Sequence, residues 1–363
     1  MNCEPYIKQF VQDFAPYKDK WNYEDGCVLY GAYLLYQVTG DEIYKTVILD
    51  YLHAFISPEG KIYNYSKEEY NIDSVLSGRL LFPAMAWEPE DKRFKIAADE
   101  IRSQLETHPR TEEGNFWHKK IYPWQVWLDG LYMAQPFYAR YDTEFGGKGR
   151  YKDILRKFQT VRKRLFVEDK GLYIHAYDEK RAQPWADKET GHSPNFWLRA
   201  AGWHLVGLVD TYDEISETIF EVKEGFVPLL QEALEGIFRY QDEESGLFYD
   251  LVDRADLEEN FLESSGSAMI AYTALKASRL GVVDKEIYVP KALRIMQGLE
   301  KYKLKEENGR FSLTGIVQVS GLGPGNERDG SVDYYLSEPV VADDHKGAGA
   351  FMMACSEMLR LQN

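Results

Sequence analysis

The sequence predicts an all-α protein built as an (α/α)6 barrel, in which six outer helices surround six inner ones. Two observations predict this fold. A helix start rich in small residues recurs six times along the chain, and charged segments of helical periodicity lie between these starts. Short strand-like pieces fall between the helices, so we also expect small β-hairpins on one rim of the barrel.

Each recurring start places a glycine at or near the beginning of an apolar helix. The separations between these glycines run from 52 to 81 residues, which is too irregular for a short solenoid repeat but suits helical hairpins with variable loops. The helices that follow carry few charges and have apolar residues on more than one face, as fully buried helices do. The six glycines are Gly26, Gly78, Gly130, Gly202, Gly266 and Gly347.

The segments between these starts have their apolar residues on one side, which is typical of helices that pack on a core from outside. An open solenoid of the TPR or HEAT type is the alternative, but such repeats are shorter and more uniform. The clearest outer segments are residues 41–56, 91–106, 151–166 and 285–300.

Three strand-like pieces lie between the predicted helices, at residues 171–178, 246–253 and 309–321. We expect them to form hairpins on the rim that carries the functional site, because binding residues are often held on loops above a rigid scaffold.

Length and composition indicate one large domain over residues 1–363, because no Pro/Gly/Ser-rich linker divides the chain. The net charge of −16 disfavours nucleic acid and anionic membranes as partners. No apolar run approaches the roughly 20 residues that cross a bilayer. The first residues do not resemble a signal peptide, so we expect a soluble, cytoplasmic protein.

The three cysteines, Cys3, Cys27 and Cys355, lie far apart and lack the spacing of metal ligands. We expect them to be buried or free thiols, and we expect neither a metal nor a cofactor.

The segment FWHKKIYPWQVWLDGLYMA, residues 116–134, combines one aspartate with tryptophans and cations. Aromatic faces beside an acid and positive charges suit a sugar that carries a carboxylate. The aspartate is Asp129, which directly precedes Gly130, and it is the foremost catalytic candidate.

Asp73 lies five residues before Gly78, so it occupies a place similar to that of Asp129 on the preceding inner helix. Two carboxylates at one cleft are the usual equipment for cleaving glycosides, and their repulsion raises the pKa of one of them. The alternative is that Asp73 only caps its helix.

His118 and His175 lie in loops rich in Trp and Tyr, and neither has the i, i+4 partner of a metal site. We expect both to contact sugar. Arg199 stands between Trp197 and Trp203, where its guanidinium is suited to bind a uronate carboxylate in bidentate fashion. The alternative is an arginine packed on tryptophan at the surface.

The glycine-rich stretch after residue 320 lacks the Lys-Ser/Thr of a phosphate-binding loop. We interpret it as a rim loop that brings Tyr334, Tyr335 or Lys346 over the cleft.

Four segments, residues 108–137, 173–203, 263–272 and 328–351, resemble glycoside hydrolase family 105, the unsaturated rhamnogalacturonyl hydrolases. The resemblance extends from about Trp21 to the end of the chain, with the segments in matching order. It implies an (α/α)6 barrel, in agreement with the sixfold pattern.

The resemblance also implies a substrate and a reaction. The substrate is a pectin-lyase product, a disaccharide or short oligosaccharide in which a 4,5-unsaturated galacturonyl residue is linked to rhamnose. Asp129 matches the general acid/base that protonates C4 and activates water for attack at C5, with Asp73 assisting. The hemiketal that results opens and releases rhamnose. The residues that match substrate contacts are Trp21 and Tyr23 at the entrance, His118, Lys119, His175, Trp197, Arg199, Trp203 and Lys346.

Three alternatives remain. The sister unsaturated glucuronyl hydrolases share the fold and the hydration chemistry but act on glycosaminoglycan disaccharides. Some sugar epimerases use the same toroid with catalytic histidines on the inner helices. A noncatalytic helical repeat scaffold would present a groove for proteins and show no turnover.

Overall fold

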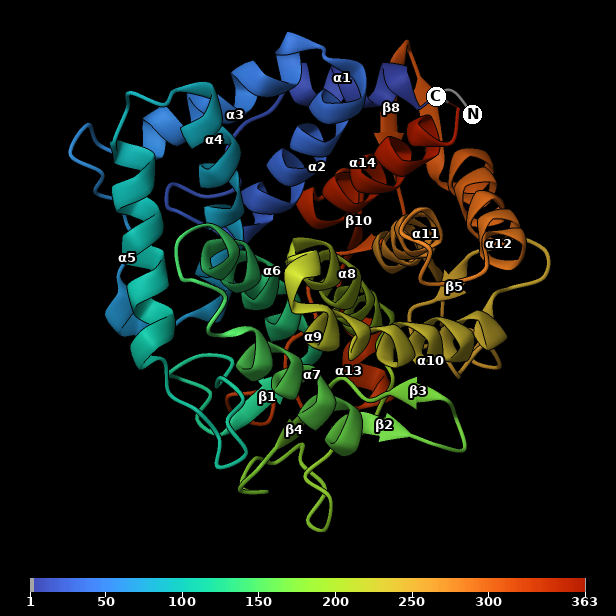
Figure 1. Cartoon of the computed structure of the whole chain (residues 1–363). Coiled ribbons are helices and arrows are strands. Elements are labelled where there is room, and N and C mark those ends of the chain that lie inside the picture. The colour runs from blue at the N-terminus through green and yellow to red at the C-terminus, as the bar shows by residue number, and fades with distance from the viewer. Residues whose placement is uncertain (1–2, 363) are drawn as a thin grey trace.

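The computed structural model describes residues 3–362, and their helices form two concentric rings (Figure 1). Each inner helix packs on the next, and the last one, α14, packs back on the first, α2. The ring is therefore closed, which confirms the predicted barrel over an open solenoid. The inner ring comprises α2 (Tyr23–Thr39), η2 (Ile72–Leu80) continued by α4 (Leu81–Trp87), α6 (Leu128–Glu144), α8 (Leu198–Glu214), α11 (Ser264–Arg279) and α14 (His345–Arg360).

The outer helices lie around this ring, and the four predicted outer segments fall on α3, α5, α7 and α12. Two further outer helices, α1 and α10, complete the set. The outer ring comprises α1 (Glu4–Gln12), α3 (Glu42–Phe55), α5 (Arg93–Thr107), α7 (Tyr151–Leu165), α10 (Val227–Ile237) and α12 (Lys285–Gly298). The remaining short helices are η1 (Lys67–Glu69), η3 (Glu217–Ile219), α9 (Phe220–Glu224), η4 (Phe238–Tyr240), η5 (Leu299–Lys303) and α13 (Val332–Ser337).

The second inner element differs from the other five because it begins as a 3-10 helix. The side chain of Asn71 accepts a hydrogen bond from the backbone N of Asp73 at 3.1 Å and so starts this helix. A 3-10 helix rises about 2.0 Å per residue against 1.5 Å for an α-helix. The nine residues of η2 therefore span more of the barrel's height than nine α-helical residues would.

The ring closes between α2 and α14 through two glycines. A Cβ on Gly349 would lie 2.4 Å from the backbone carbonyl carbon of Cys27, and a Cβ on Gly31 would lie 2.8 Å from the Cβ of Met352. Any larger residue at either position would push the two helices apart, so small residues in the inner helices allow them to approach closely.

The strands form five two-stranded antiparallel ladders. The sequence suggested that residues 171–178 form a hairpin of their own, but they do not. Instead, β3 pairs with β2, and β4 pairs with β1. The strands are β1 (Gln125–Trp127), β2 (Phe166–Val167), β3 (Leu172–Tyr173), β4 (Ala176–Asp178), β5 (Phe248–Tyr249), β6 (Leu262–Glu263), β7 (Leu304–Glu307), β8 (Arg310–Leu313), β9 (Ile316–Val317) and β10 (Val340–Val341).

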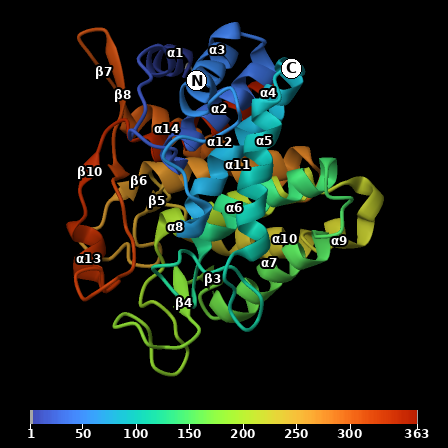
Figure 2. The ribbon, with the colours of Figure 1, turned by 90° about the vertical axis from the view of Figure 1, so that its left-hand side faces the viewer.

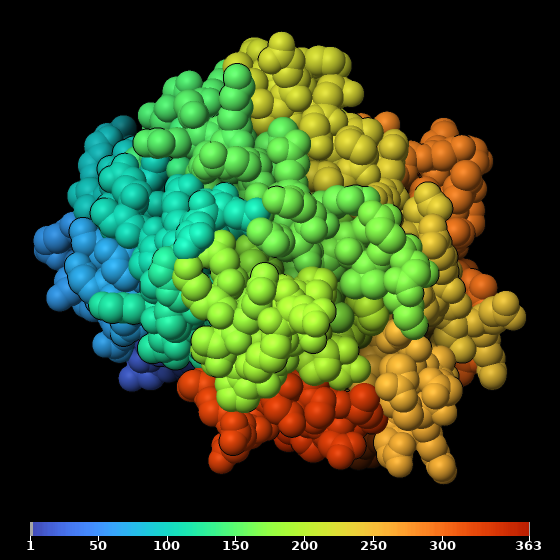
Figure 3. Space-filling model, turned by 90° about the horizontal axis from the view of Figure 1, so that it is seen from below, coloured from blue at the N-terminus to red at the C-terminus, as the bar shows by residue number. Residues whose placement is uncertain are grey.

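The loops that carry these strands gather on one side of the barrel. In Figure 2, β7, β8, β10 and α13 lie together along the left-hand edge. In Figure 3, the yellow-green loop between β4 and α8 lies against the red segment that includes α13. The side chain of Asn195 joins these two segments by donating a hydrogen bond to the carbonyl of Gly330 at 2.7 Å.

Charged side chains fill the interior of the barrel toward the C-terminal ends of the inner helices. Asp210 of α8 accepts hydrogen bonds from Arg79 of η2 and Lys276 of α11, both at 2.8 Å. Tyr272 donates to the same carboxylate at 2.6 Å. Because all four side chains are buried, this cluster ties three inner helices together inside the barrel.

Two further expectations are tested by the described residues. Within residues 3–362, no helix is long and apolar enough to cross a membrane. Cys3, Cys27 and Cys355 are buried free thiols, as predicted.

Replacing Asp210 by Ala should destabilise the fold by about 3 kcal/mol, because Arg79 and Lys276 would stay buried but lose the carboxylate they share, leaving Glu214 at 3.8 Å and Asp213 at 2.8 Å to offset their charges. Urea denaturation followed by circular dichroism measures this change. The matched control is Glu235→Ala, which breaks an exposed pair with Arg239 and should cost under about 1 kcal/mol. Equal losses in the two variants would contradict a structural role for the cluster.

Candidate active site

A pocket of 190 Å³ opens at the N-terminal ends of the inner helices. The first turns of α2, η2, α6, α8 and α14 each contribute a side chain to it. Nine of the eleven predicted site residues line this pocket: Tyr23, Asp73, His118, Lys119, Asp129, Trp197, Arg199, Trp203 and Lys346.

The loop before β1 brings two of these residues to the start of η2. The backbone N of Ile72 donates to the carbonyl of His118 at 3.2 Å, and the N of His118 donates to the carbonyl of Gln125 at 2.9 Å. These bonds hold His118 and Lys119 beside Asp73.

Asp73 forms an ion pair with Lys119, with 2.6 Å between Oδ2 and Nζ. Burial alone would raise the pKa of Asp73, but the charge of Lys119 and the proximity of His118 outweigh burial and lower this pKa. Asp73 is therefore ionised and paired. It is not the cap of its helix, because the side chain of Asn71 fills that role.

His118 stacks on the indole of Trp127, with 4.2 Å between ring centroids and 12° between planes. Burial lowers the pKa of His118 to about 4, and this effect exceeds the opposing influence of Asp73. His118 is therefore neutral at neutral pH and adds no positive charge to the pocket.

Asp129 lies in the first turn of α6, and His175 lies behind it. The β1–β4 ladder pairs Trp127 with Ala176, and the N of Leu128 donates to the carbonyl of His175 at 3.0 Å. This pairing sets His175 Nε2 3.3 Å from Asp129 Oδ2.

His175 is fully buried and does not line the pocket, contrary to the sequence expectation of a sugar contact. Its Nδ1 lies 2.7 Å from the hydroxyl of Tyr335. Burial raises the pKa of Tyr335 well above its usual value, so the hydroxyl keeps its proton. Tyr335, expected over the cleft, instead completes a buried chain from its own hydroxyl through His175 to Asp129.

Arg199 lines the pocket, but the protein uses most of its donors. Its Nε donates to Ser265 Oγ at 2.7 Å, its Nη2 donates to the carbonyl of Val317, and its Nη1 lies 3.4 Å from the carbonyl of Gln318. Glu263 balances its charge at 3.5 Å. Arg199 thus ties α8 to the start of α11 and to β9 with three of its five N–H donors, and the expected bidentate contact with a carboxylate stays a prediction.

The tryptophans divide between the pocket and the core. Trp197 and Trp203 line the pocket, and Trp197 Nε1 donates to Asp250 Oδ1 at 3.1 Å. Trp21, expected at the entrance, is only 2% exposed and donates from Nε1 to the carbonyl of Ser74 at 2.8 Å. It is a core residue that joins α2 to η2, so this expectation is wrong.

Sequence reasoning missed about half of the pocket lining. Tyr122 and Trp127 lie within the aromatic motif of residues 116–134, and four other missed residues lie on the stretch before α13. The sequence indicated that these two segments lie near the site but not which of their side chains reach it. Lys18 and Glu24, which form an ion pair, had no sequence signature. The missed residues are Lys18, Glu24, Tyr122, Trp127, Met133, Val319, Ser320, Gly321 and Arg328.

Several buried polar atoms of the pocket residues have no hydrogen-bond partner within the described chain. They include Glu24 Oε2, Asp73 Oδ1 and Ser320 Oγ. Buried polar atoms are normally satisfied, so such atoms around one cavity suit a ligand with several hydroxyl groups.

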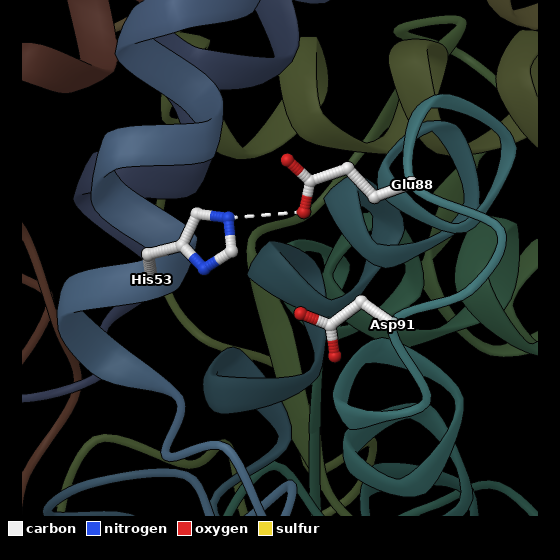
Figure 4. Close-up of side chains that lie close together, drawn as sticks. All are labelled: His53, Glu88 and Asp91. Carbon is white, nitrogen blue, oxygen red and sulfur yellow. Dashed lines mark hydrogen bonds and ion pairs between the residues drawn. The ribbon is translucent and has the colours of Figure 1, made fainter.

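Within residues 3–362, the one group of side chains spaced to hold a metal ion lies outside this pocket (Figure 4). It consists of His53, Glu88 and Asp91, with His53 Nε2 3.0 Å from Glu88 Oε2. Asp91 already pairs with Arg93 at 2.7 Å. The pocket therefore offers acid, cation and aromatic groups rather than a set of metal ligands.

Comparison with known proteins agrees with this geometry. A protein from *Agrobacterium fabrum* named Protein Atu3128 is 39% identical over 237 residues, which are 63% of this chain and 99% of that protein. The unsaturated rhamnogalacturonyl hydrolase YesR of *Bacillus subtilis* is 27% identical over 84% of this chain and 80% of its own length. The structure of a family 105 glycoside hydrolase from *C. acetobutylicum* superposes with a TM-score of 0.94, at 37% identity and 98% coverage of both chains.

The barrel and its pocket are thus those of a glycoside hydrolase. The model of Glycosyl Hydrolase Family 88 matches residues 3–362, and the chain belongs to this family of unsaturated uronyl hydrolases, with family 105 as its structural neighbour.

Replacing Tyr335 by Phe should lower kcat on an unsaturated uronyl disaccharide by about tenfold, because His175 would lose the hydrogen bond that orients it toward Asp129. KM should change less, since neither side chain lines the pocket. Steady-state kinetics measure both constants. Tyr302→Phe, which alters an exposed hydroxyl bonded to Lys301, is the matched control. An unchanged kcat in the Tyr335 variant would show that the chain does not assist Asp129.

Proposed function

We propose that the protein removes the 4,5-unsaturated galacturonyl residue from rhamnose in the products of rhamnogalacturonan lyases. The reaction is hydration of the C4=C5 double bond, with Asp129 as the general acid/base. The proposed site of action is the cytoplasm, on short fragments. The pocket volume of 190 Å³ supports action on short fragments, because pockets that enclose larger ligands measure roughly 300–1,000 Å³.

One observation carries the proposal: of the three carboxylates within residues 3–362 that line the pocket, Asp129 alone has no lysine or arginine partner. Glu24 pairs with Lys18 and Asp73 pairs with Lys119. Displacement at a sugar's anomeric carbon needs two carboxyl groups with separate roles. A single unpaired carboxyl group beside His175 instead suits hydration, in which one group gives and then takes a proton.

The proposed steps balance in protons and bonds. The Asp129 carboxyl group transfers its proton to C4 while the double bond opens, and positive charge develops at C5. Water adds to C5 and returns a proton to Asp129, so the carboxyl group is restored. The C5 hemiketal then opens: the C5–O5 bond breaks, C5 becomes a ketone, and the proton of its hydroxyl passes to O5. This leaves a hemiacetal at C1, which collapses to an aldehyde as the C1–O bond to rhamnose breaks and the hydroxyl proton passes to the rhamnose oxygen.

The comparisons support this choice of substrate. The name of the *Bacillus subtilis* relative specifies an unsaturated rhamnogalacturonyl hydrolase. The epimerase alternative needs catalytic histidines on the inner helices, but among the described residues His118 is the one histidine that lines the pocket, and it lies on a loop.

Replacing Asp129 by Asn should lower kcat by at least about 100-fold, because an amide neither donates nor accepts the proton in transit. The disaccharide should still bind, since the other pocket side chains are unchanged. Loss of the ultraviolet absorbance of the double bond measures turnover, and calorimetry measures binding. The control is Asp99→Asn, which alters an exposed carboxylate bonded to Lys95. Substantial residual turnover would remove Asp129 from the proposed role.

The choice of substrate has its own test. Unsaturated rhamnogalacturonan disaccharide should lose its ultraviolet absorbance when incubated with the protein, whereas unsaturated chondroitin disaccharide should lose it far more slowly. A faster reaction with chondroitin disaccharide would assign the protein to the glucuronyl type. No reaction with either would favour the scaffold or epimerase alternatives.

A further inference from the structure

Among the cations within residues 3–362 that line the pocket, one has neither a hydrogen-bond acceptor nor an ion-pair partner for its side chain. Lys18 pairs with Glu24, Lys119 with Asp73 at 2.6 Å, and Lys346 with Asp344 at 2.8 Å. Arg199 has Glu263 as its charge partner at 3.5 Å, and three of its five N–H donors are engaged by Ser265 and by the backbone near β9. Arg328 also lines the pocket, and within residues 3–362 its guanidinium makes no hydrogen bond or ion pair.

The position of Arg328 is set by the loop before α13. A Cβ built on Gly321 would lie 3.0 Å from Arg328 Nη1 and 3.7 Å from Trp127 Cη2. The guanidinium therefore lies beside the glycine and near the indole, where a larger residue at 321 would crowd it. The N of Gly321 donates to the hydroxyl of Tyr334 at 2.9 Å, which holds this part of the loop in place.

This placement puts the free guanidinium in the same pocket as the proposed catalytic group. Trp127 stands two residues before Asp129, and both side chains line the same pocket. A guanidinium presents paired N–H donors that match the two oxygens of a carboxylate, and it stays charged at all relevant pH values.

We propose that Arg328, rather than Arg199, binds the carboxylate of the unsaturated uronyl ring and so makes the pocket selective for acidic sugars. This inference rests on the proposed function. The carboxylate is attached to C5, one end of the double bond, so a hydrogen bond to it fixes the reacting carbons relative to Asp129. Arg199 keeps a structural role because its donors already hold α8, α11 and β9 together.

The overall charge of the protein makes such a group necessary. The chain carries a net charge of −16, which repels an anionic substrate at long range. The paired lysines of the pocket are each offset by a carboxylate at close distance. An unpaired arginine supplies the net positive charge that a uronate needs where it binds.

The test combines a change in the protein with the matching change in the substrate. The unsaturated rhamnogalacturonan disaccharide and its uronate methyl ester are compared on the unaltered protein and on Arg328→Gln. The unaltered protein should favour the acid by about 10- to 100-fold in kcat/KM, as expected for a charge-assisted hydrogen bond. In Arg328→Gln this preference should fall to near one, through loss of activity on the acid while activity on the ester stays nearly constant.

Two further variants separate charge from structure. Arg328→Lys should recover part of the preference, because a lysine restores the charge but not the paired donors. Arg239→Gln, which removes an exposed arginine paired with Glu235, should leave the preference unchanged. An acid preference that persists in Arg328→Gln, or equal losses on acid and ester, would overturn the proposal.

Equilibrium binding distinguishes failure of this inference from failure of the proposed function. Galacturonate and its methyl ester are titrated into the unaltered protein and into Arg328→Gln by calorimetry, with no turnover required. If neither disaccharide reacts but galacturonate binds more tightly than its ester only when Arg328 is present, the reaction is wrong and the role of Arg328 holds. If the disaccharide reacts and the variant still prefers galacturonate, the reaction holds and the inference is wrong.

Discussion

The buried cluster around Asp210 is the interaction on which the barrel depends. Asp210 receives Arg79 from η2 and Lys276 from α11, so one carboxylate joins three of the six inner elements. Buried charges are costly unless they are paired, and a helix displaced from this cluster would leave an unpaired ion in the interior. The cluster lies toward the C-terminal ends of the inner helices. The N-terminal ends are thereby left to form the pocket.

The direction of the inner helices shapes the electrostatics of that pocket. Asp73, Asp129 and Arg199 each lie at or near the first turn of an inner element, so the N-termini converge on the same cavity. The partial positive charge of a helix N-terminus stabilises anions, so the start of η2 favours the ionised form of Asp73. This arrangement suits Asp73, whose pKa is lowered once Lys119 and His118 overcome the effect of burial. It also opposes the net negative charge of the chain where an acidic sugar would bind.

The sequence predicted the fold well because a closed ring of buried helices leaves a strong local pattern. Glycine starts lie where one inner helix approaches the next closely, as Gly26 does against Ser77 and Gly266 against Leu198. The site was predicted less well, because the spacing of residues in the sequence does not reveal which hydrogen-bond donors are already bound by other groups of the protein. Trp21 and Arg199 have the composition of ligand contacts, yet Trp21 bonds to Ser74 in the core and Arg199 bonds to backbone carbonyls. Arg328 escaped notice because only folding brings its loop beside Trp127.

The pairing of charges within the pocket determines which groups are free to act. Each lysine that lines the cavity is matched by an acidic side chain, and the charge of Lys119 keeps Asp73 ionised. Asp129 faces a histidine instead, and that histidine is fixed by a tyrosine hydroxyl. In the proposed reaction, proton transfer falls to Asp129, which lies beside a histidine, and anion binding falls to Arg328, which lies near the indole of Trp127. Because both side chains line one cavity of 190 Å³, a single uronyl ring could contact both, with its carboxylate on the arginine and its double bond toward the aspartate.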